Sequence, residues 1–72
     1  MKAQPTMYGI IETLKNATAD LSAKGVAHYA DYENTSENLR WIQDEMFDLV
    51  EAGKAVATRV EGQNAGWFFR LV

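Results

Sequence analysis

The sequence predicts an α+β fold in which a helical core precedes a C-terminal β-hairpin. Up to Gly53, apolar residues recur at the i, i+3, i+4 and i+7 spacing of amphipathic helices. After Gly53 they alternate with other residues, which is the period of a strand. The turn-forming residues Glu61–Gly66 divide this alternating region into two strands. With 72 residues, the chain is expected to form one domain spanning residues 1–72.

The first helix is expected over residues 6–24. Pro5 stands just before it, where the first helical turn tolerates proline. The apolar stripe of this helix consists of Met7, Ile10, Ile11, Leu14, Ala17 and Leu21. Lys24 and Gly25 predict its end, because a cation suits the last turn and glycine suits the left-handed cap.

The next segment, VAHYADYE over residues 26–33, fits two structures. As a short helix it places Val26, Tyr29 and Ala30 on one face. As a strand it places one face at Val26, His28, Ala30 and Tyr32. Eight residues are too few for the period to decide, so a short helix and a strand both remain open.

A long helix is expected over residues 35–52. Asn34, Thr35 and Ser36 are all residue types that cap a helix, and Asn34 has the capping-box spacing to Glu37. The core stripe of this helix consists of Leu39, Ile42, Met46, Leu49 and Val50. Gly53 then predicts its end.

The remaining residues, 54–72, predict a hairpin with a six-residue tip. Alternation in its first strand places Val56, Thr58 and Val60 on one face. The second strand places Trp67, Phe69 and Leu71 on one face and Phe68, Arg70 and Val72 on the other. We expect one of these aromatic faces to pack on the first helix, since a domain this small needs its large apolar groups for its core.

The composition favours a protein without an active site, metal site or cofactor. The chain has no cysteine, which excludes disulfides and thiolate chemistry and fits a cytoplasmic location. Its single histidine, His28, has no histidine or cysteine partner for a transition-metal site or a catalytic pair. The glycines form no phosphate-binding loop. The start, MKAQPTMYGII, predicts neither a signal peptide nor a membrane span, and no small-molecule substrate is evident.

Charge is unevenly distributed along the chain, whose formal net charge is −3. Between Asp31 and Glu51 stand seven acids and one base, Arg40. The rest of the chain holds six bases and three acids. A nucleic-acid-binding protein usually presents a basic face, so the acidic middle of the chain bears directly on its function.

The order of these elements resembles a winged helix-turn-helix domain. The resemblance rests on VAHYADYENTSENLRWIQDEMFDLVEAGKAVATRV, in which LVEAGKAV is similar to the family's passage from recognition helix into wing. It implies a helix-turn-helix formed by Val26–Tyr32, a turn at Glu33–Thr35 and a recognition helix at Ser36–Ala52, with Lys54–Val72 as the wing. It also implies a small DNA-binding transcriptional regulator of bacterial, plasmid or phage type.

One departure from the family pattern concerns the turn. The family often carries alanine or glycine in the first helix and turn, where the two helices pack closely. Here Ala27 and Ala30 provide small residues, whereas the turn has no glycine. If residues 26–33 form a strand, the second helix of the family is missing or shortened.

The resemblance identifies candidate contacts to duplex DNA. In this family the N-terminal half of the recognition helix approaches the base edges. That half contains Asn38, Arg40 and Gln43, whose side-chain types pair with adenine or guanine edges. The phosphate contacts would come from Arg59 and Arg70 on the wing and from Lys15 and Lys24 on the first helix.

A protein–protein interaction module, or an inhibitor, is the alternative. On a helical wheel Trp41 lies among charges and away from the core stripe, so it is exposed unless the short second element covers it or the helix packs on two sides. Together with Asp44, Phe47 and Asp48, it forms a candidate interface for a basic protein surface. A homodimer with Trp41 or Phe47 at the interface is compatible with either function.

Overall fold

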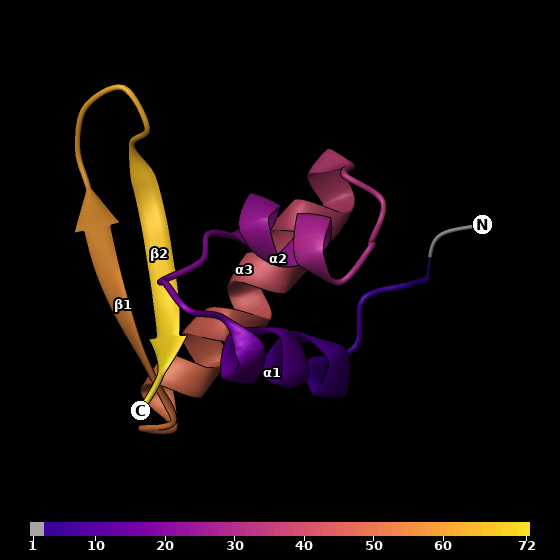
Figure 1. Ribbon diagram of the computed structural model, residues 1–72, viewed down its shortest axis with the longest axis horizontal. Coiled ribbons are helices and arrows are strands. Elements are labelled where there is room, and N and C mark those ends of the chain that lie inside the picture. Colours follow the sequence, from indigo (N-terminus) through magenta and orange to yellow (C-terminus); the bar gives the residue numbers. More distant parts are fainter. Residues whose placement is uncertain (1–2) are drawn as a thin grey trace.

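The computed structural model describes residues 3–72, which form three helices followed by an antiparallel hairpin (Figure 1). The elements are α1 (Met7–Asn16), α2 (Ala23–Tyr29), α3 (Ser36–Glu51), β1 (Ala55–Val60) and β2 (Gly66–Leu71). The α+β class and the layout of helices before hairpin are therefore confirmed. The arrangement is compatible with a winged helix.

Helix α1 is shorter than the expected helix over residues 6–24. It begins at Met7, where the Thr6 side chain accepts a hydrogen bond from the Gly9 amide at 3.0 Å. It ends at Asn16, and Ala17 is already extended, with φ −74° and ψ 142°. The expectation was wrong because Leu21 pairs through its backbone with β2, so the chain cannot remain helical up to that residue.

Helix α2 begins where the first helix was expected to end. Ser22 caps it by accepting a hydrogen bond from the Gly25 amide at 3.2 Å. Lys24 and Gly25 therefore belong to the first turn of α2 and do not terminate α1. The ambiguous segment 26–33 is helical as far as Tyr29, and of its remaining residues only Tyr32 forms a single bridge, with Ala3.

The connection from α2 to α3 covers residues 30–35 and is longer than the expected turn at Glu33–Thr35. Asp31 adopts a left-handed conformation with φ 58°, which serves the turn in place of a glycine. The amide of Tyr32 then returns to the carbonyl of Ala27 at 2.9 Å. Thr35, rather than Asn34, caps α3 by accepting from the Asn38 amide at 3.1 Å.

Helix α3 and the hairpin closely match their predicted positions. Gly53 follows α3 with φ 77°, the left-handed conformation expected at a helix end. β1 and β2 are antiparallel, with Ala57 opposite Phe69 and Val60 opposite Gly66. The tip is one residue shorter than expected, because Gly66 belongs to β2.

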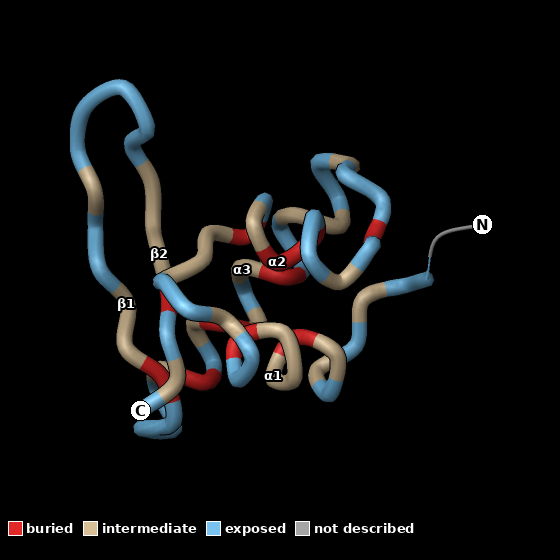
Figure 2. Tube along the Cα trace, in the orientation of Figure 1, coloured by how far each residue is buried: buried red, intermediate tan, exposed pale blue. Residues whose placement is uncertain are grey.

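The core lies where the three helices meet the lower part of the hairpin (Figure 2). Phe69, Ile10, Ile42, Met46 and Val26 are its largest fully buried side chains. Trp67 and Leu71 share the inward face of β2 with Phe69 and pack against this core, whereas Arg70 on the other face is exposed. Among the described residues 3–72, none of the helices has the length and apolar character that a membrane span requires.

Candidate functional site

The side of α3 that faces away from the core carries a regular row of exposed residues. Ile42, Met46 and Leu49 bury the inner side, each at most 5% exposed. The exposed row consists of Glu37, Trp41, Asp44, Asp48 and Glu51. These residues are spaced by four, three, four and three positions, so they form one continuous line along the helix. We call this line the outer seam.

Trp41 is the only apolar residue of the outer seam and remains 40% exposed. A shallow hollow beside it is lined by Ser36, Glu37, Arg40, Trp41 and Asp44, all of α3. No residue of α2 lines this hollow. The short second element therefore does not cover the Trp41 ring, which was one of the alternatives left open by the sequence. A large aromatic side chain is thus exposed among carboxylates.

The carboxylates of the outer seam are not neutralised by other described residues. The described ion pairs join Arg59 to Glu61 and Arg70 to Asp20, and neither involves the seam. Arg40 lies next to Trp41 in the sequence, but within residues 3–72 it forms no ion pair with a seam carboxylate. Among residues 3–72, none of the four seam carboxylates therefore has an ion-pair partner.

Phe47 is not available for the interface proposed from the sequence. Its ring packs edge-to-face on Trp67, with centroids 5.3 Å apart, and on Phe69 at 4.9 Å. These contacts hold α3 against the inward face of β2. Trp41, Asp44 and Asp48 of that set lie together on the outer seam, whereas Phe47 faces the hairpin.

A second feature, the wing groove, lies between α3 and the tip of the hairpin. Lys24 of α2 and Arg40 and Gln43 of α3 line it together with Gln63 and Asn64 of the tip. We call the surface formed by these five polar residues the wing groove. Its complete lining contains two cations and no acid. Three of the residues predicted to contact DNA are thus brought together.

The wing groove and the outer seam adjoin each other on α3. Arg40 and Gln43 each precede a seam residue by one position, Trp41 and Asp44. Arg40 also lines the hollow beside Trp41, together with Glu37 and Asp44, so the groove and the seam meet at this residue. The lining of the groove itself contains no acid, although the chain has a net charge of −3.

The other residues predicted to contact DNA lie elsewhere. Asn38 donates its side-chain amide to the Glu33 carbonyl at 3.0 Å, which fixes the connection before α3. Arg59 lies 3.6 Å from Glu61, and its guanidinium carbon is 5.4 Å from the centroid of the Trp67 ring. Both interactions direct its charge towards the hairpin itself.

Lys15 and Arg70 line a third hollow, at the end of α1 and the end of β2. Arg70 lies 4.0 Å from Asp20 there, so part of its charge is offset. The basic residues predicted to contact phosphates are therefore divided among separate places. They do not form one strip from α1 across the wing.

Sequence reasoning missed Gln63 and Asn64 as candidate site residues. The sequence identified them only as turn formers in the tip. Their position beside α3 depends on the direction that the hairpin takes after Gly53, which local sequence does not predict. Among residues 3–72, no group of three or more histidine, aspartate or glutamate side chains could hold a metal ion. Comparison with protein families, characterised proteins and solved structures finds no match to the chain.

Proposed function

We propose that the protein is a non-enzymatic, winged-helix-like interaction module that binds a basic protein surface through the outer seam. The observation that carries this proposal is the composition of the seam. All five of its positions are exposed, four of them are carboxylates, and the fifth is Trp41. Tryptophan is among the residues most often responsible for the binding energy of an interface.

The two kinds of side chain would act in different ways. Unpaired carboxylates attract a basic partner over a distance and raise the rate of association, with an effect that salt weakens. Trp41 supplies apolar area that is removed from water only in the complex. Charge would therefore select the partner, whereas the ring would hold it in place.

The same composition argues against insertion of the outer seam into duplex DNA. In a winged helix, the exposed side of this helix approaches the major groove. Four carboxylates there would face phosphates and add repulsion where DNA-binding proteins place Lys and Arg. A symmetric homodimer through the seam meets the same difficulty, since it would bring like charges together.

The proposal can be tested with a Lys-rich amphipathic peptide as a probe, followed by two-dimensional NMR. We expect the perturbed amides to lie along the seam, from Glu37 to Glu51. Trp41→Ala should weaken binding at least tenfold, which corresponds to about 1.4 kcal/mol, although it removes no charge. Added salt should weaken binding of the peptide to the unchanged protein, because it screens the seam carboxylates.

Matched variants separate this proposal from simple attraction between opposite charges. Asp44→Asn tests a seam carboxylate, and Glu61→Gln removes an equal charge from the hairpin. Asp44→Asn should weaken the complex more than Glu61→Gln does. Equal effects of these two variants, together with an unchanged affinity of Trp41→Ala, would disprove a site at the seam.

Binding of duplex DNA as a transcriptional regulator is the second candidate function, and the wing groove favours it. This groove combines two cations with three amide side chains and excludes acids. Arg and Gln are suited to base edges, and Lys24 is suited to a phosphate. DNA would have to be contacted from the hairpin side of α3, with the seam turned away.

A mobility-shift assay at low salt tests the DNA candidate. We expect Arg40→Ala and Lys24→Ala to weaken binding and to reduce its dependence on salt. Asp44→Asn should strengthen binding, because it removes a charge that repels phosphates. Lack of a shift at micromolar protein, where non-specific binding is already expected, would rule this function out.

A further inference from the structure

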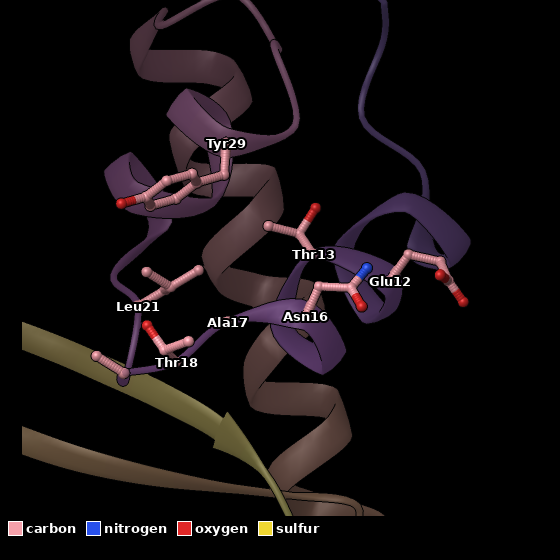
Figure 3. Close-up of a pocket in the computed structure, with 8 residues that line it drawn as sticks. Glu12, Thr13, Asn16, Ala17, Thr18, Leu21 and Tyr29 are labelled. Atoms are coloured by element: carbon pink, nitrogen blue, oxygen red, sulfur yellow. The ribbon is translucent and has the colours of Figure 1, made fainter.

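A pocket of about 380 Å³ opens between α1 and α2, apart from both the outer seam and the wing groove (Figure 3). Its walls are the second half of α1, the link that follows α1, and Tyr29 at the end of α2. None of its lining residues belongs to the seam or the groove. Its volume falls in the lower part of the range of small-molecule sites.

The electrostatics of this pocket favour a cation. Glu12 is the only charged residue in its lining, and within residues 3–72 it forms no ion pair. The pocket also adjoins the C-terminal end of α1, where Asn16 and Ala17 line it. The last carbonyls of a helix lack helical partners and carry the negative end of its dipole.

The remaining polar groups of the pocket also suit a donor. Thr13 already donates its hydroxyl hydrogen to the Gly9 carbonyl at 2.8 Å, so its oxygen is left to accept. Asn16 and Thr18 supply further acceptor oxygens, and both residues are exposed. No lysine or arginine lines the pocket to compete for these acceptors.

The apolar part of the pocket suits a compact hydrocarbon body. Tyr29 is 71% exposed, and its ring forms one wall above Leu21 (Figure 3). The face of an aromatic ring attracts cations, quaternary ammonium groups among them. Leu21 is held in place by its backbone bonds to Phe69, so this side of the pocket is fixed in the folded chain.

We propose that the pocket between α1 and α2 binds a small organic cation with an apolar body, such as an alkylammonium compound. The C-terminal end of α1 would face the charge, and the carboxylate of Glu12, which points away from Tyr29 (Figure 3), would attract the cation from the far end of the pocket. The ring of Tyr29 would cover the alkyl groups. The ligand would be selected for its charge as well as for its shape, which distinguishes this site from an apolar crevice.

Choline and its neutral isostere, 3,3-dimethyl-1-butanol, provide a direct test. In NMR titrations of the intact chain, choline should shift the amides of residues 12–21 and Tyr29, with a Kd of about 1 mM. The neutral isostere should bind at least tenfold more weakly. Equal affinities, or no localised shifts with choline, would overturn the proposal.

Variants of the pocket make the test specific to its chemistry. Glu12→Gln keeps the shape of the side chain and removes its charge, and Tyr29→Leu removes the ring. Each should weaken choline binding at least fivefold, whereas Glu61→Gln on the hairpin should not. Thermal unfolding of each variant verifies that it is folded. Full choline affinity in both folded pocket variants would contradict the assigned site.

Discussion

Leu21 and Phe69, far apart in the sequence, exchange two backbone hydrogen bonds. The Leu21 amide donates to the Phe69 carbonyl at 2.9 Å, and the Phe69 amide donates to the Leu21 carbonyl at 2.8 Å. This antiparallel bridge adds the link between α1 and α2 to the edge of β2. It connects the start of the fold to its last strand beside the most buried ring of the core.

The amide of Leu21 is therefore expected to resist hydrogen exchange, although it lies outside any helix. Opening it requires the separation of Leu21 from β2, which disturbs the core around Phe69. The amide of Thr18, in the exposed part of the same link, should exchange much faster. NMR-detected exchange compares the two, and similar rates would show that the bridge is not maintained in solution.

Gly9→Ala should destabilise the protein although alanine favours helices. An added Cβ would overlap the hydroxyl of Tyr32, a side chain that is 5% exposed. We expect a net loss of up to about 2 kcal/mol in the free energy of unfolding, because overpacking costs about 1–3 kcal/mol and the gain in helix propensity offsets about 1 kcal/mol of it. Urea denaturation followed by circular dichroism measures this difference.

Gly25→Ala provides the matched control for Gly9→Ala. A Cβ at Gly25 would lie 3.2 Å from the Cδ2 atom of Leu21, a flexible side-chain end that can shift slightly. The change should be small, or stabilising by up to about 1 kcal/mol. Adding Tyr32→Phe to Gly9→Ala should restore part of the lost stability, because it removes the overlapping hydroxyl.

Periodicity predicted α3 and the hairpin well because their apolar residues are both regular and buried. It failed after Asn16 because Ala17 and Leu21 continue the helical spacing of α1 although the chain is extended there. The signal that ends α1 is the pairing of Leu21 with Phe69, which no local pattern contains. Lys24 and Gly25 then suggested a helix end, although they begin α2.

The candidate site could be predicted only in part, for a related reason. A helical wheel is sufficient to place Trp41 among acids, since all of these residues belong to one helix. The wing groove combines α2, α3 and the hairpin tip, and its formation depends on tertiary packing. Arg40 and Gln43 were predicted together with Asn38 as contacts to bases, whereas Gln63 and Asn64 had no local signal beyond turn formation.

Asn38→Ala is expected to affect stability rather than binding. The variant loses the hydrogen bond to the Glu33 carbonyl but keeps the Thr35 cap on the residue 38 amide. We expect a loss of about 0.5–1.5 kcal/mol in unfolding free energy and unchanged affinity for the basic peptide. Chemical denaturation and the peptide titration measure these effects. A marked loss of affinity with full stability would instead make Asn38 a contact residue.

The two tryptophans should respond oppositely to truncation. Trp67 lies against the core and packs on Phe47, so Trp67→Ala should cost about 3 kcal/mol in unfolding free energy. Trp41 lies on the outer seam, so Trp41→Ala should change stability by no more than about 1 kcal/mol. Urea denaturation of both variants tests this difference. Comparable losses would mean that Trp41 supports the fold, and the seam would then lack its proposed anchor.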